Sequence, residues 1–119
     1  MAITDSFFTQ FIRIQDRTNK LIYTVPNDQP VVVIGGNLTI NSDETEVINI
    51  KVVSNSVEYL IIKNFKISNI NPEQFINSIL KLALNPGDQL YIQALNSYGI
   101  VSNPDIYGFI SFVKQPKLV

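Results

Sequence analysis

The sequence predicts an all-β protein, an antiparallel two-sheet β-sandwich of jelly-roll or Ig-like type with about seven or eight short strands. Ile and Val dominate its apolar residues, and side chains branched at Cβ pack well on a pleated sheet but lose rotamer freedom in a helix. Apolar and polar residues alternate in several segments, and turn-forming residues separate these segments at short intervals. Short connections favour antiparallel pairing, and in a chain of 119 residues two packed sheets close one core.

The N-terminal segment allows two interpretations. Its apolar residues fit one stripe of a helix, but Phe8, Ile12 and Ile14 also fit one face of a strand. We favour the strand. The predicted organisation is therefore an N-terminal arm or edge strand over residues 1–17 and a single β-sandwich domain over residues 18–119.

The first part of the predicted domain contains strands over residues 21–25, 31–40 and 46–53. Pro26-Asn27-Asp28 predicts a turn after the first strand, because Pro fixes φ and Asn and Asp bond locally to the backbone. Gly35-Gly36 predicts a bulge or a close backbone approach within the second strand. Residues 41–44 are expected to form a hairpin loop before the third strand.

The second part begins with a turn at Ser54-Asn55-Ser56 and a strand over residues 57–67, in which the apolar run 59–62 predicts burial on both faces. Asn71-Pro72 predicts the start of a short helix near residues 72–80, since Asn caps helices and Pro is tolerated at the first helical position. Asn85-Pro86-Gly87-Asp88 predicts a turn. The remaining predicted strands cover residues 81–84, 90–94 and 107–113.

The residues available for catalysis are few. The chain has no His and no Cys, which excludes Ser-His and Cys-His nucleophiles and the usual zinc sites. Asp43, Glu44 and Glu46 form the densest acidic group but lack the spacing of a calcium loop, so a solvated hairpin tip is expected. Glu58 is expected to face solvent or to pair with a Lys across the sheet. We therefore expect no catalytic residue, no metal and no cofactor. We also expect that the protein is not an enzyme.

Charge and hydropathy argue against nucleic acid and membrane as partners. The net charge is −1 and no Lys/Arg cluster is present, so no nucleic-acid partner is expected. No apolar stretch reaches the roughly 18 residues of a membrane span, and the N-terminus has no signal-peptide pattern. We expect no membrane partner and synthesis in a cytoplasm.

Two segments carry a family resemblance. The segment "LIYTVPNDQPVVVIGGNLTINSDETEVINIKVV" (residues 21–53) and the segment "LALNPGDQLYIQA" (residues 82–94) resemble small β-sandwich virion structural proteins of tailed bacteriophages. Such proteins are capsid decoration (cement) proteins or tail and fibre components, and they are commonly trimeric. The resemblance implies a capsid decoration protein, located in the virion and made in the host cytoplasm, that binds the major capsid protein or another virion protein as a homotrimer.

The predicted contact residues differ between two functional hypotheses, capsid docking and glycan binding. For capsid docking, Phe7, Phe8, Phe11 and Ile12 are the predicted anchors, since aromatic side chains bury large areas at low entropic cost; the alternative is that they complete the core. The alternative function is a tail or head-fibre component or a host-surface glycan-binding module. Its predicted glycan-binding residues are Tyr91, Tyr98 and Tyr107, because aromatic faces suit sugar rings.

Overall fold

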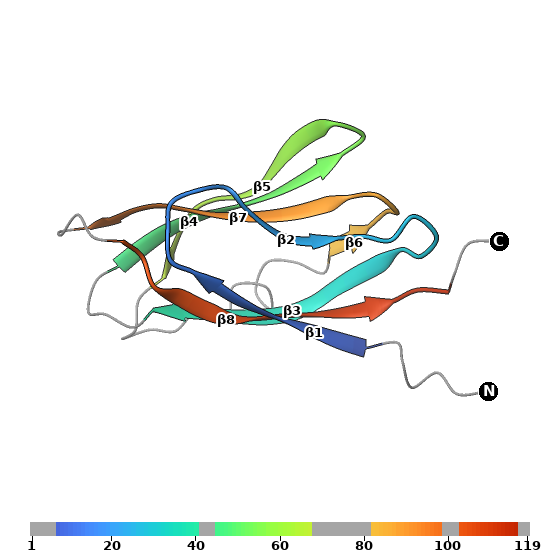
Figure 1. Ribbon diagram of the computed structural model, residues 1–119, viewed down its shortest axis with the longest axis horizontal. Coiled ribbons are helices and arrows are strands. Elements are labelled where there is room, and N and C mark those ends of the chain that lie inside the picture. Colours follow the sequence, from blue (N-terminus) through green and yellow to red (C-terminus); the bar gives the residue numbers. More distant parts are fainter. Residues whose placement is uncertain (1–6, 41–44, 68–81, 99–102, 117–119) are drawn as a thin grey trace.

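The computed structural model describes residues 7–40, 45–67, 82–98 and 103–116, which form strands and their connections (Figure 1). The strands, in chain order, are β1 (Phe7–Ile14), β2 (Lys20–Thr24), β3 (Val31–Ile40), β4 (Thr45–Ser54), β5 (Val57–Ile67), β6 (Leu82–Leu84), β7 (Gln89–Tyr98) and β8 (Ile106–Lys114). The predicted all-β class is confirmed. The helix predicted near residues 72–80 and the loop at 41–44 lie outside the described residues.

The strands form two antiparallel four-stranded sheets that pack face to face. The first sheet has the order β1-β8-β3-β6 and the second has the order β2-β7-β4-β5. Figure 1 shows β1, β8 and β3 as one layer and β2, β7, β4 and β5 as the other. Strand β1 pairs with β8, β2 with β7, β3 with β6 and β4 with β5. This is the strand order of an eight-stranded jelly roll, one of the two predicted sandwich types.

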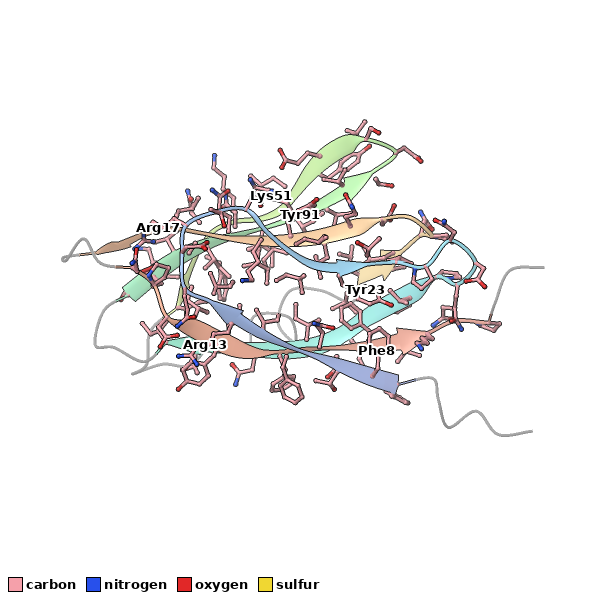
Figure 2. All side chains as sticks on the ribbon, viewed as in Figure 1. Phe8, Arg13, Arg17, Tyr23, Lys51 and Tyr91 are labelled. Carbon is pink, nitrogen blue, oxygen red and sulfur yellow. The ribbon has the colours of Figure 1, made fainter. Side chains whose placement is uncertain are left out.

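The core lies between the two sheets and consists mainly of Ile, Val and Leu. Alternate residues of each strand enter it, as the period of two along a strand requires; they include Ile12, Ile14, Leu38, Ile48, Ile92, Ile110 and Phe112, all at most 6 % exposed. At one end, Phe8 stacks on Phe112 with ring centroids 4.8 Å apart, and Tyr23 lies 5.3 Å from Phe8. Figure 2 shows Phe8 and Tyr23 extending from opposite sheets toward each other.

Local turn chemistry accounts for three irregular points of the backbone. In the Asn85–Asp88 turn, Gly87 has a φ of 87° and the Asp88 N–H donates to the Asn85 carbonyl at 3.0 Å, as in a type II turn with Pro at its second position. Asn55 and Ser56 have φ values of 52° and 64°, as in a two-residue type I′ hairpin. The β3–β8 register shifts next to Gly35, which confirms the predicted bulge.

Two expectations about burial were wrong. The run 59–62 is not buried on both faces: Tyr59 is 51 % exposed and Leu60 46 % exposed, because the end of the β4–β5 hairpin extends away from the other strands (Figure 1). Glu46 is not at a solvated tip but is 3 % exposed and bonded to Arg17; Asp43 and Glu44 lie outside the described residues. The expectation for Glu58 is confirmed, since it is exposed and lies 3.6 Å from Lys51 Nζ.

Candidate functional site: the outer face of the first sheet

Three neighbouring strands build the outer face of the first sheet. Because Ile12, Ile110 and Leu38 point into the core, the residues beside them in β1, β8 and β3 point outward. Strand pairing aligns these outward residues in rows across the sheet: Phe11 with Phe109 and Asn37; Arg13 with Tyr107 and Thr39; Thr9 with Ser111 and Gly35. The face is thus a regular grid of side chains on paired strands.

Large aromatic side chains are exposed on this face. The exposed fractions are 67 % for Phe7, 79 % for Phe11, 42 % for Tyr107 and 38 % for Phe109. We call the surface that these four residues form the aromatic face. An aromatic ring left in water forgoes the free energy of burial, and contiguous apolar patches on soluble proteins mark interaction sites.

A hollow of about 470 Å³ lies within the aromatic face. Its walls include Phe11, Asn37, Tyr107 and Phe109. Asn37 Oδ1 is buried and has no hydrogen-bond partner among the described residues. Buried polar atoms in folded proteins are normally paired, so this carbonyl is an exception in the wall of the hollow.

A glycine permits the backbone packing beneath the hollow. Gly108 lies between Tyr107 and Phe109 in β8, opposite Leu38 of β3 and Ile12 of β1. A methyl group on Gly108 would collide with the carbonyl oxygen of Asn37. Any larger residue would therefore separate β8 from β3 at the point where Asn37 is held.

Polar contacts fix both sides of the hollow. The guanidinium of Arg13 donates from Nε and Nη2 to the two carboxylate oxygens of Asp105, at 3.1 and 3.2 Å. On the other side, the hydroxyls of Thr9 and Ser111 share a hydrogen bond of 3.1 Å. The hydroxyl pair lies between the rows of Phe7 and Phe11, and Arg13 lies in the row of Tyr107, so polar groups alternate with the aromatic rings on this face.

The predicted anchors divide between the two sides of β1. Phe7 and Phe11 lie on the aromatic face. Phe8 and Ile12 point the other way, since Phe8 is in the aromatic stack with Phe112 and Ile12 is 6 % exposed in the core. These two residues complete the core, the alternative that the sequence also allowed, because successive residues of a strand point to opposite faces.

The predicted glycan-binding tyrosines do not form one patch. Tyr107 lies on the aromatic face, whereas Tyr91 lies between buried residues of β7 and points outward from the second sheet, near Lys51 (Figure 2). The Tyr91 hydroxyl donates to Gln89 Oε1 at 3.2 Å. The side chain of Tyr98 lies outside the described residues. Tyr91 and Tyr107 are therefore on opposite outer faces of the sandwich and cannot contact the same sugar ring.

Sequence reasoning missed two residues of the site, Asn37 and Phe109. Phe109 is two positions from Tyr107 in a predicted strand, so the period of two already placed both rings on one face. Asn37 gave no comparable signal, because its position beside Phe109 depends on the pairing of β3 with β8.

No protein-family model, curated protein or solved structure matches the chain. Function is therefore inferred from the surface itself.

The one ion pair at the hollow, among the described residues, is that of Arg13 with Asp105. Across the part of the chain that the structure describes, no group of three or more His, Cys, Asp or Glu residues is placed to hold a metal ion, and no helix is long and apolar enough to cross a membrane. The side-chain and backbone hydrogen bonds from Thr18 lower the pKa of Asp16, and burial raises the pKa of Tyr23. Both groups lie away from the hollow, whose residues offer apolar contact and hydrogen bonds.

Proposed function

We propose that this protein is a bacteriophage virion structural protein, a capsid decoration protein that binds the outer capsid surface through its aromatic face. The observation that carries the proposal is the exposure of Phe7, Phe11, Tyr107 and Phe109 on one side of a regular sheet. Aromatic residues are enriched at protein interfaces and often contribute most of the binding energy. A sheet surface held by strand pairing also loses little conformational freedom on binding.

The fold and the resemblance support this choice of partner. Eight-stranded jelly rolls are used by viral capsid and lectin domains, although a fold alone does not determine a function. The segments at residues 21–53 and 82–94, which resemble phage virion proteins, correspond to strands in both sheets. Together they favour the major capsid protein as the occupant of the aromatic face.

Docking would stabilise a shell mechanically. A rigid sandwich bound across neighbouring capsid subunits adds interface area that must be broken before the subunits separate, and so resists the pressure of packaged DNA. The capsid surface that fits this face is apolar where it meets the rings of Phe11 and Phe109.

The test uses phage shells assembled in cells from which the gene for this chain has been deleted. Purified protein is added to the shells, and bound protein is measured by sedimentation together with the temperature at which the shells open. The proposal predicts saturable binding and a higher opening temperature. Shells that bind none of the protein would refute it.

A second function is favoured by one observation, the hollow beside Tyr107. A pyranose ring can place its apolar C–H face on an aromatic ring while an amide bonds its hydroxyls, and the hollow combines Tyr107 and Phe109 with the side-chain amide of Asn37. A tail or head-fibre module that binds host-surface glycan would use these groups. It predicts that the protein binds host cells and that Tyr107→Ala and Asn37→Ala abolish this binding, with no binding to shells.

A further inference from the structure

The edges of the two sheets differ in how well they are protected against further pairing. A sheet edge presents unpaired N–H and C=O groups, which proteins usually guard with short strands, charges or bulges. Strand β6 has three residues, β2 has five with a bulge after Leu21, and β5 carries Lys63, Lys66 and two register shifts against β4. Each of these edges is guarded.

Strand β1 is different. It has eight residues, pairs with β8 in an unbroken register, and has Arg13 as its one charged residue. Among the described strands, none pairs with the other edge of β1. It also carries Phe7 and Phe11, the most exposed aromatic residues of the described chain. A long, regular and apolar edge of this kind is suited to strand addition.

We propose that β1 pairs antiparallel with β1 of a second copy of this chain, about a twofold axis that passes through Gln10. A twofold axis at this residue places Gln10 opposite Gln10, Thr9 opposite Phe11, Phe8 opposite Ile12 and Phe7 opposite Arg13. The interface is self-complementary, as twofold symmetry requires. This inference does not depend on what the aromatic face binds.

The chemistry of β1 favours this register over axes at Arg13 and Phe11. A glutamine amide both donates and accepts hydrogen bonds, so two Gln10 side chains can pair across the axis. The edge of the Arg13 guanidinium is bonded to Asp105, but its flat face remains able to lie on the Phe7 ring of the second copy. An axis at Arg13 would place two positive charges opposite each other, and an axis at Phe11 would place the Gln10 amide opposite Ile12.

Pairing at β1 would join the two first sheets into one continuous sheet. The outward residues Phe7 and Phe11 of both copies would then lie side by side on a single surface. A dimer would present two aromatic faces in one fixed orientation, and simultaneous binding of two linked sites raises the overall affinity for a repetitive target.

Disulfide trapping tests the register directly, because the natural chain contains no Cys. In Gln10→Cys, the only two thiols of the dimer lie on directly opposed residues, whose Cβ atoms are about 4.5–5.5 Å apart in an antiparallel pair. Mild oxidation should therefore give a covalent dimer. The matched controls Thr9→Cys and Phe11→Cys should link much less, since each is opposite a different residue. Equal linking of all three variants, or none in Gln10→Cys, would overturn the register.

Light scattering on a sizing column tests the pairing itself. The unmodified protein should have a mass of about 27 kDa, twice the 13.4 kDa of one chain. Gln10→Lys and Gln10→Glu should each be monomeric through like-charge repulsion, and an equimolar mixture of the two should recover the dimer. Ser111→Lys, on the same sheet but away from the edge, should remain dimeric.

Other masses contradict the inference. A monomer, or the trimer that the family resemblance implies, would exclude a β1–β1 dimer, as would a mixture of the two Gln10 variants that stays monomeric. Shell binding by a monomeric Gln10 variant would leave the proposed function intact, so the two proposals can fail separately.

Discussion

Arg17 and Glu46 form a bidentate ion pair that joins the β1–β2 connection to the second sheet. The Nη1 and Nη2 atoms of Arg17 donate to the two carboxylate oxygens of Glu46 at 3.1 and 3.2 Å. The Glu46 side chain is 4 % exposed, and the Arg17 carbonyl also accepts a hydrogen bond from Gln93 at 3.2 Å. The chain passes from one sheet to the other at this connection (Figure 2), so the pair fixes a crossover of the jelly roll.

Removing Arg17 should destabilise the protein substantially. Arg17→Ala leaves the Glu46 carboxylate buried without its partner, which should lower the free energy of unfolding by about 3 kcal/mol. Arg13→Ala is the matched control, because it breaks the bidentate pair with Asp105, which is exposed to solvent. The free energy of unfolding should fall by less than about 1 kcal/mol in this variant. Urea denaturation measures both. Equal losses in the two variants would contradict the role assigned to Glu46.

Alkaline pH should weaken the aromatic stack. Burial raises the pKa of Tyr23 above its ordinary value of 10.0, so at high pH the unfolded chain releases the Tyr23 proton before the folded chain does. The stability linked to this group is fully present below pH 10 and is lost as pH rises through the raised pKa. Above pH 10, the free energy of unfolding of the Tyr23→Phe variant should fall less steeply with rising pH than that of the natural chain. Identical slopes would show that Tyr23 does not contribute.

The β4–β5 turn should be open to stabilisation. Ser56 has a φ of 64°, a conformation that costs a residue with a Cβ about 1–2 kcal/mol and glycine almost nothing. Ser56→Gly completes the Asn-Gly pair preferred in type I′ turns and should raise the free energy of unfolding by about 1 kcal/mol. Asn55→Gly should raise the free energy of unfolding by less, because Asn tolerates positive φ. Thermal unfolding of the two variants tests this order, and a loss of stability in Ser56→Gly would contradict the turn geometry.

The parts of the structure that local chemistry determines were predicted best. Alternation and turn residues predicted the strands and the turn at Asn85–Asp88, because period and φ preference act over a few residues. Alternation also placed Phe7 and Phe8 on opposite faces, but which of them is buried depends on the pairing of β1 with β8. The position of Glu46 depends on Arg17, which is distant in sequence, and the separation of Tyr91 from Tyr107 depends on which sheet each strand joins.

The same limit applies to the candidate site. Phe7 and Phe11 were predicted as anchors from their residue type. The row of Phe11, Phe109 and Asn37 comes from three strands that are far apart in the chain, and a single sequence contains no local signal for such a row.

Binding of a Phe11→Ala/Phe109→Ala double variant to shells assembled without this chain tests the central claim most directly. These two rings are neighbours on the aromatic face, and central aromatic anchors contribute about 2 kcal/mol or more each, so the dissociation constant should rise by about 700-fold or more. A Tyr59→Ala/Leu60→Ala variant, altered at exposed residues of the β4–β5 hairpin, should bind as the natural protein does. Unchanged binding by the Phe11/Phe109 variant, with its fold intact, would contradict the assignment of the aromatic face as the docking surface.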